Sequence, residues 1–209
     1  MPLAAQLTGR FNGPAPLGNA DLPVAVGPLG EMVSVAKYYE WARRGLIFHG
    51  QTAATGVAPG TAIGTTAAFC LSNPLNSNVD LVVLQGSMEY VSGTLGAGFV
   101  SWLMGALPTE TAPTGTLILA RNGLMDGVAS RARAFTTATI VAPTPVRPFA
   151  SIGASLASTA VQPWQIVDNV DGAIIVRPGC NLSLHATAAA GTSPLVVFGC
   201  LWAEIPTQG

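Results

Sequence analysis

Short apolar runs separated by turn residues make up most of the chain after residue 60. Asn181–Ala188 alternates polar and apolar residues, which is typical of a strand with one buried face. The run from Leu195 to Ile205 is apolar on both faces, as expected for a strand in the centre of a sandwich or at a subunit interface. We predict strands at Ala67–Leu71, Val79–Tyr90, Gly98–Gly105, Thr116–Arg121, Ala132–Val141, Gln165–Val167, Ala173–Arg177, Asn181–Ala188 and Leu195–Ile205.

Turn-forming pairs such as Asn73-Pro74, Asn122-Gly123 and Pro178-Gly179 separate these strands. Many short strands joined by such turns predict an all-β sandwich or barrel. Strand–helix alternation is absent, which argues against a Rossmann or TIM-barrel fold.

Two connections are also predicted from local composition. Asp168–Gly172 has the residues of a tight turn, so it predicts a hairpin between the strands on either side of it. The Thr-, Ala- and Pro-rich stretch Thr139–Gln162 predicts a long irregular connection.

Residues 31–49 have a helical periodicity and the highest density of charged and aromatic residues. A spacing of i, i+3, i+4 and i+7 relates Val35, Tyr38, Tyr39 and Ala42. Glu40 precedes Arg44 by four residues, which is a favourable helical pair, and Gly45 suits a C-cap. We expect one short helix that ends near Gly45, followed by a strand through Leu46–Phe48.

Residues 1–30 have a different composition, with five prolines and five glycines that disfavour regular structure. The segment nevertheless carries apolar side chains, among them Leu3, Leu7 and Phe11, whereas a flexible linker is usually more polar. We therefore predict an extended N-terminal arm over 1–30 and a single β-sandwich domain over 31–209. The arm lies either across a neighbouring molecule or on its own domain.

Charge is scarce in this chain of 209 residues: charged residues are 9% of it and hydrophobic residues 49%, whereas soluble domains average about 25% charged. The net charge of −1 excludes a strongly basic surface for nucleic acid or for an anionic membrane. Lys37 is the single lysine. Interfaces are depleted in lysine and tolerate arginine, so the composition indicates a surface covered by other protein. The alternative is the composition bias of a GC-rich genome.

The cysteines are Cys70, Cys180 and Cys200, an odd number with wide spacing in apolar surroundings. This pattern indicates free buried thiols in a reducing compartment, and the alternative is one disulfide with a spare thiol. The N-terminus lacks the pattern of a signal peptide. The uncharged stretch Tyr90–Pro108 is interrupted by glycines, so we predict no membrane span.

Candidate chemistry is sparse. Ser155 lacks the second glycine of a nucleophile elbow. His49 and His185 have no neighbouring partner in the sequence for acid–base work. Asp168, Asn169 and Asp171 contain oxygen ligands but not the spacing of a calcium loop. We predict a non-enzymatic protein without a cofactor or metal.

Contact residues are better represented than catalytic ones. Tyr, Trp and Arg are the residue types enriched at interface hot spots. We predict a protein interface formed by the arm and by an aromatic and arginine patch. Its residues are Leu3, Leu7, Arg10, Phe11, Tyr38, Tyr39, Trp41, Arg43 and Arg44.

The C-terminal pattern is a strand ending in Arg177-Pro178-Gly179, then Leu182-Ser183-Leu184-His185, then an apolar strand closing in Trp202-Ala203-Glu204. It resembles the jelly-roll modules of tailed-bacteriophage virion proteins. Tyr38-Tyr39-Glu40 and Leu71-Ser72-Asn73-Pro74 also resemble stretches of phage structural proteins. The resemblance implies an all-β, jelly-roll-like sandwich that serves as a capsid cement or decoration protein.

From this resemblance we expect a homotrimer or homodimer that binds the major capsid protein and stabilises the head. It would be made in the host cytoplasm and reside on the capsid surface of the virion. The alternative is a receptor- or glycan-binding module of a tail or fibre, because Trp164 lies near Asp168 and Asn169 in the sequence.

Overall fold

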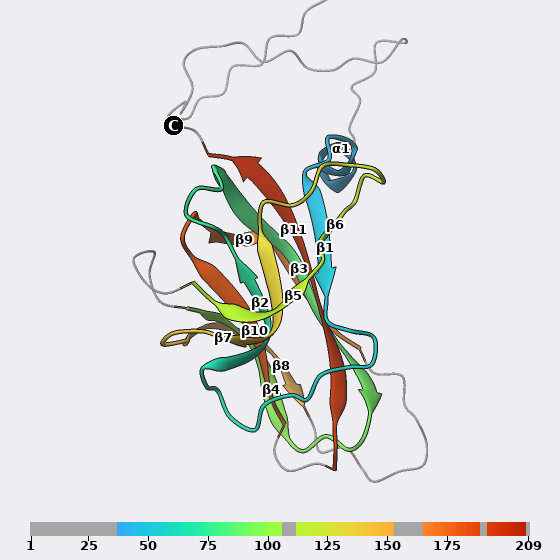
Figure 1. Cartoon of the computed structure of the whole chain (residues 1–209). Helices are drawn as coiled ribbons and strands as arrows, with labels where there is room; N and C mark the ends of the chain where they lie inside the picture. The colour runs from blue at the N-terminus through green and yellow to red at the C-terminus, as the bar shows by residue number, and fades with distance from the viewer. Residues whose placement is uncertain (1–36, 106–111, 153–164, 189–191, 208–209) are drawn as a thin grey trace, which may run out of the picture. The chain divides into compact units, whose positions relative to one another are not determined.

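The structure is a computed structural model, and it describes residues 37–105, 112–152, 165–188 and 192–207. The chain divides between Glu40 and Trp41, and the second unit, Trp41–Gly209, contains both sheets. The predicted arm over 1–30 lies outside the described residues. Two antiparallel sheets pack against each other, so the predicted all-β sandwich with one short helix is confirmed (Figure 1).

One helix and eleven strands are described. In chain order they are α1 (Lys37–Arg43), β1 (Ile47–Gln51), β2 (Thr66–Ser72), β3 (Val79–Ser92), β4 (Gly98–Met104), β5 (Thr114–Ile118), β6 (Arg121–Asn122), β7 (Arg133–Thr139), β8 (Thr144–Ile152), β9 (Gln165–Val176), β10 (Asn181–Ala188) and β11 (Leu195–Pro206). The five-stranded sheet has the order β6-β1-β11-β3-β9, and the six-stranded sheet the order β5-β7-β2-β10-β4-β8.

The helix ends where the sequence predicts. The amide of Gly45 donates to the carbonyl of Ala42, and the amide of Leu46 donates to that of Trp41. Gly45 has a φ of +69°, and the two bonds together form a Schellman C-cap. A residue with a side chain would be strained at this φ. The cap turns the chain directly into β1.

Eight of the strands form a jelly roll, since they pair as a long antiparallel hairpin rolled into two sheets. Its nested pairs are β1 with β11, β2 with β10, β3 with β9 and β4 with β8. The first and third pairs lie in one sheet, and the second and fourth lie in the other. The predicted jelly-roll-like topology follows from this pairing.

The remaining strands, β5, β6 and β7, form an insertion between β4 and β8. β7 pairs with β2 and carries β5 at the edge of the six-stranded sheet. β6 pairs with β1 at the edge of the five-stranded sheet. The insertion therefore adds strands to the same side of both sheets, as Figure 1 shows for the ribbon that runs from β5 to β6.

The predicted hairpin turn at Asp168–Gly172 is wrong. These residues lie inside β9, and both halves of β9 pair with the single long strand β3. Positive φ angles at Asp171 (50°) and Gly172 (86°), with a register shift opposite Leu84, mark a β-bulge. Turn-forming residues are accommodated there as an irregularity within a strand.

The predicted irregular connection over Thr139–Gln162 is also wrong in its first half. Thr144–Ile152 forms β8, which pairs with β4 through two register shifts. β8 is an edge strand, so Pro145 and Pro148 need not donate to a second neighbour. Residues 153–162 lie outside the described residues.

Candidate interaction surface

The two histidines differ in their surroundings, since His185 is buried and His49 is exposed. His185 on β10 is buried, and desolvation lowers its pKa to about 4. Its Nε2 lies 3.1 Å from the hydroxyl of Ser183, which is fully buried. Ser183 is enclosed in the core, while His185 lies at the wall of a second hollow of about 550 Å³. Partial burial also lowers the pKa of His49.

The three cysteines are free thiols. Cys70 and Cys200 are buried, as predicted, while Cys180 is half-buried. Desolvation raises the pKa of Cys70 to about 12 and that of Cys200 still further. Desolvation therefore favours the protonated form of both thiols at neutral pH.

The acidic residues of β9 do not form an open site. Asp168 is buried, and its Oδ1 accepts a bond of 2.8 Å from the guanidinium of Arg147. Asn169 points the other way, and its Oδ1 accepts a bond of 2.9 Å from the amide of Gln85. The described residues contain no group of three or more His, Cys, Asp or Glu placed to hold a metal ion. Trp164, the third member of the predicted sugar-binding cluster, lies outside the described residues.

The residues of the predicted interface fall into two groups. Leu3, Leu7, Arg10 and Phe11 lie outside the described residues. The other five lie on α1 or directly after it. Tyr39, Arg43 and Arg44 are exposed, while Tyr38 and Trp41 are half-buried. The structure thus places aromatic and arginine side chains on one short helix, as the periodicity predicts.

A second surface, which sequence reasoning missed, lies on the insertion. Exposed apolar side chains follow one another from the end of β5 to the loop after β6. We call them the apolar edge; they are Leu117, Leu119, Leu124, Met125 and Val128. Met125 is 87% exposed, Val128 74% and Leu119 67%, the highest values among the large hydrophobic residues of the described chain.

The apolar edge results from the alternation of side chains along an edge strand. Ile118 and Ala120 turn inward and pack against the core of the sandwich. Because side chains alternate along an extended chain, Leu117 and Leu119 must point outward. An ordinary strand would place polar residues there, so leucines at these positions are a feature that the fold does not require.

Hydrogen bonds hold the loop after β6 in one conformation. The side-chain amide of Asn122 donates to the carbonyls of Gly45 (2.9 Å) and Val128 (3.0 Å), while its Oδ1 accepts from the amide of Leu124 (2.8 Å). The amide of Gly123 donates to the carbonyl of Ile47 (2.7 Å). Gly127 packs so closely on Asn122 that a Cβ at residue 127 would lie 2.5 Å from Asn122 Cγ. The apolar side chains are therefore presented on a rigid loop.

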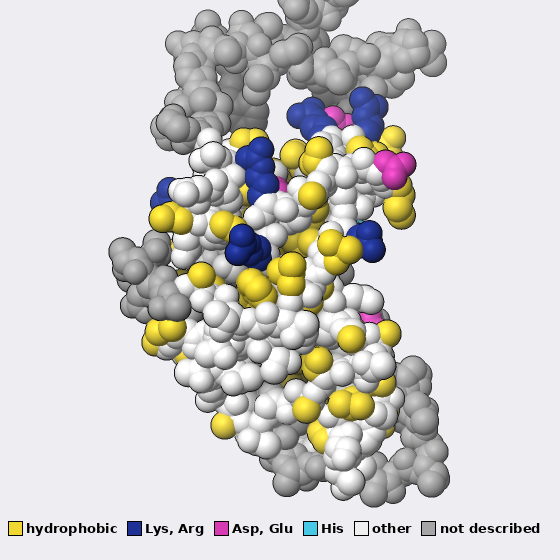
Figure 2. Space-filling model, viewed as in Figure 1, with side chains coloured by type: hydrophobic (Ala, Val, Ile, Leu, Met, Phe, Trp, Pro, Cys, Tyr) yellow, Lys and Arg dark blue, Asp and Glu magenta, His cyan; other side chains and the backbone are white. Residues whose placement is uncertain are grey.

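Charge is sparse along the part of the insertion that carries the apolar edge. Between Ala112 and Ser130 only Arg121 and Asp126 are charged, and neither forms an ion pair within the described chain. Figure 2 shows hydrophobic side chains gathered over β5 and the ribbon that follows it, with few charged groups between them. The surface is apolar with one positive and one negative group.

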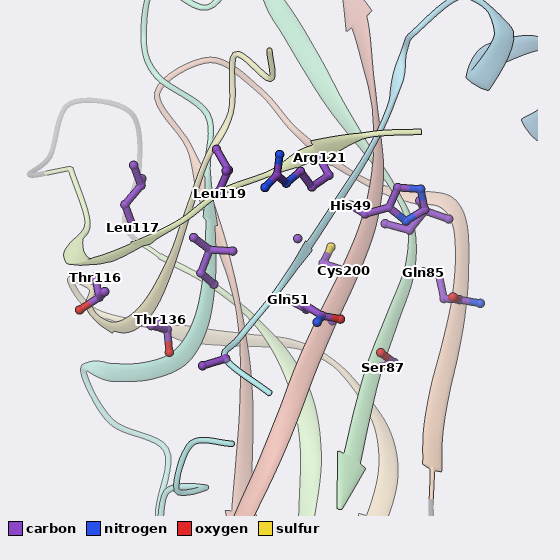
Figure 3. Close-up of a pocket in the computed structure, with 15 residues that line it drawn as sticks. His49, Gln51, Gln85, Ser87, Thr116, Leu117, Leu119, Arg121, Thr136 and Cys200 are labelled. Carbon is purple, nitrogen blue, oxygen red and sulfur yellow. The ribbon is translucent and has the colours of Figure 1, made fainter. Parts of the chain in front are cut away.

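A hollow of about 680 Å³ adjoins the apolar edge. Its lining combines Leu117, Leu119 and Arg121 from the insertion with polar residues of the five-stranded sheet, including His49 and Gln51. Figure 3 shows Arg121 and His49 at one end of the hollow and the two leucines projecting from the same side of the ribbon. His49 and Arg121 are cross-strand neighbours on β1 and β6.

Comparisons with protein-family models, with curated proteins and with solved structures found no match for this chain. Among the described residues, no helix has the length and apolar character to cross a membrane.

Proposed function

We propose that this chain is a non-enzymatic structural protein of a tailed-phage virion, a capsid cement or decoration protein that binds the major capsid protein and stabilises the head. It acts mechanically, because surface buried across neighbouring capsid subunits adds to the free energy needed to separate them. It is made in the host cytoplasm and assembles on the capsid surface.

The observation that carries this proposal is the apolar edge on its rigid loop. A preformed apolar surface lowers the entropic cost of binding another protein. Large exposed apolar patches mark interaction sites in folded proteins. The scarcity of charge and the C-terminal jelly-roll pattern support the same class of function.

The N-terminal arm and the residues of α1 supply the remaining contacts in this proposal. Leu3, Leu7, Arg10 and Phe11 on the arm lie along neighbouring capsid subunits. Tyr39, Arg43 and Arg44 offer an exposed aromatic ring and two guanidinium groups to the same partner. We do not propose the glycan-binding alternative, because Asp168 is buried and paired with Arg147.

Location and stabilisation are tested on virions of the phage that encodes the chain. We expect mass spectrometry of gradient-purified heads to detect the chain in a fixed ratio to the major capsid protein. Heads assembled without it should release DNA at a lower temperature, as measured with a DNA-binding dye. Heads that lack the chain entirely would contradict the proposal.

The role of the arm is tested by deleting residues 1–30. We expect the shortened chain to keep the circular dichroism spectrum of the sandwich and to lose co-sedimentation with heads made without the full-length chain. Unchanged co-sedimentation would remove the arm from the binding surface while leaving the remainder of the proposal in place.

A further inference from the structure

We propose that the apolar edge is the contact between two copies of this chain, related by a two-fold axis. The inference rests on the proposed function: it assigns the apolar edge to the contact between two copies and leaves the arm and α1 to contact the capsid protein. The test of the dimer requires no capsid, so the dimer proposal and the proposed capsid function can fail separately.

The charges of the edge favour a second copy. Arg121 and Asp126 lie five residues apart within the apolar edge, have opposite sign and form no ion pair within the described chain. In a two-fold contact, residue i of one copy meets residue j of the other, and the reverse holds as well. One arrangement therefore places Arg121 of each copy opposite Asp126 of the second, which forms two ion pairs. A partner with a charge of a single sign would match only one of the two groups.

The edge strand supports the same partner. β5 pairs only with β7 among the described residues, so its other side has main-chain groups without a strand neighbour. Thr114–Ile118 contains no charged residue. Natural edge strands usually carry charges or irregularities that prevent association; β5 has a register shift between Thr114 and Thr116 but no charge. A second copy of this neutral strand is not repelled, and the net charge of −1 adds little repulsion between whole molecules.

The apolar side chains provide the binding free energy. Leu117, Leu119, Met125 and Val128 lose their contact with water when the edges meet, and each contributes twice in a symmetric dimer. The Asn122 network holds the loop before association, so little conformational freedom is lost on binding.

The experiment is the solution mass of the full-length chain, measured by light scattering and sedimentation equilibrium over about 1 to 100 µM. We expect twice the monomer mass of 21.2 kDa. A monomer throughout this range, or a trimer, would overturn the proposal, and a monomer would leave the apolar edge available for the capsid protein.

A matched pair of variants locates the contact. Leu119→Ser changes a residue of the edge that is 67% exposed, and Leu75→Ser changes one that is 65% exposed in the turn after β2. We expect Leu119→Ser to raise the dimer dissociation constant at least about tenfold and Leu75→Ser to leave it unchanged. Equal effects, or none from Leu119→Ser, would overturn the location. Thermal unfolding of each variant checks that the fold is intact.

Charge variants test the two-fold arrangement. Arg121→Glu places like charges opposite each other in the dimer, so it should weaken association. Adding Asp126→Asn removes that repulsion and should partly restore association. Asparagine is chosen because it tolerates the φ of +66° at this position. If the double variant associates no better than Arg121→Glu alone, the proposed pairing is wrong.

Discussion

Trp102 on the six-stranded sheet donates a hydrogen bond of 2.9 Å from its indole Nε1 to Oδ2 of Asp168 on the five-stranded sheet. Arg147, the cross-strand neighbour of Trp102, binds the other oxygen of the same carboxylate. The two donors therefore lie on one sheet and the acceptor on the other. This contact crosses the core and fixes how the two sheets lie against each other.

Asp168→Ala should lower the free energy of unfolding by about 2–4 kcal/mol, because it leaves the buried indole N–H of Trp102 without an acceptor and breaks a partly buried ion pair. Urea unfolding measures the effect. Asn169→Ala is the matched control, since its side chain has only an exposed bond to Gln85 and should cost about 0.5 kcal/mol or less. Similar losses in the two variants would refute a special role for Asp168.

Gly86→Ala should destabilise the sandwich by about 1–3 kcal/mol or more through overpacking. A Cβ at residue 86 would lie 2.2 Å from the indole carbon Cζ2 of Trp102, while β3 is held between β9 and β11 on either side. Gly64→Ala is the control, because nothing lies within 4 Å of a Cβ there. Its effect should be neutral or slightly stabilising. Thermal unfolding of both variants measures these changes in stability.

Glu204→Gln should loosen the bend that leads into β7. The buried carboxylate of Glu204 accepts from the hydroxyl of Ser130 (2.6 Å) and from the amides of Arg131 (3.0 Å) and Ala132 (3.2 Å). An amide group replaces one acceptor oxygen with a donor, so we expect a loss of about 1–3 kcal/mol. Hydrogen exchange at Arg131 and Ala132 should accelerate. Unchanged exchange there would show that other contacts hold the bend.

The buried imidazole of His185 predicts that stability decreases in mild acid. Its folded pKa of about 4 lies below the ordinary value of 6.5, so the unfolded chain binds more protons between these values. Stability is therefore fully present above about pH 6.5 and falls as the pH drops toward about 4. From about pH 7 to about pH 5 the loss from this group is of order 2 kcal/mol.

A His185→Gln variant should show a smaller decrease over the same range, as measured by urea unfolding at the two pH values. His49→Gln is the comparison, because its pKa is lowered in the same direction but its side chain is exposed. If the wild-type chain and His185→Gln lose equal stability, the acid sensitivity lies elsewhere.

Local patterning located most strands well. The predicted Asn181–Ala188 coincides with β10, and Leu195–Ile205 matches β11 to within one residue. The first segment alternates polar and apolar residues, and the second is a long apolar run. Both patterns are typical of strands. Thr116–Arg121 was predicted as one strand, yet it contributes to β5 and β6 in different sheets. The polar and apolar pattern of a short extended segment does not show that the segment passes from one sheet to the other.

The two predictions that placed no strand where one exists have a common cause. Asp168–Gly172 has turn-forming residues, and Thr144–Ile152 contains two prolines, so local preferences oppose a strand at both places. Each segment pairs with a long neighbouring strand, β3 or β4, and bulges accommodate the unfavourable residues. Pairing partners distant in the sequence outweighed local preference.

The apolar edge was not predictable for a different reason. Leu117, Ile118 and Leu119 are consecutive apolar residues, and such a run does not reveal which side chains face the core. Leu124, Met125 and Val128 lie among turn residues whose exposure depends on what the loop packs against. The Asn122-Gly123 and Asp126-Gly127 pairs were the only signal, since they mark the ordered turn that presents these side chains.

The sequence by itself determined the all-β class, the short helix with its glycine cap and the absence of strong charge, because periodicity, capping and composition are local properties. The tertiary structure decided the nested jelly-roll pairing, the burial of Asp168 beneath Trp102 and the outward direction of Leu117 and Leu119. Those features depend on which segments meet across the sandwich. That meeting is set by the summed burial and hydrogen bonding of the whole chain and not by any one segment.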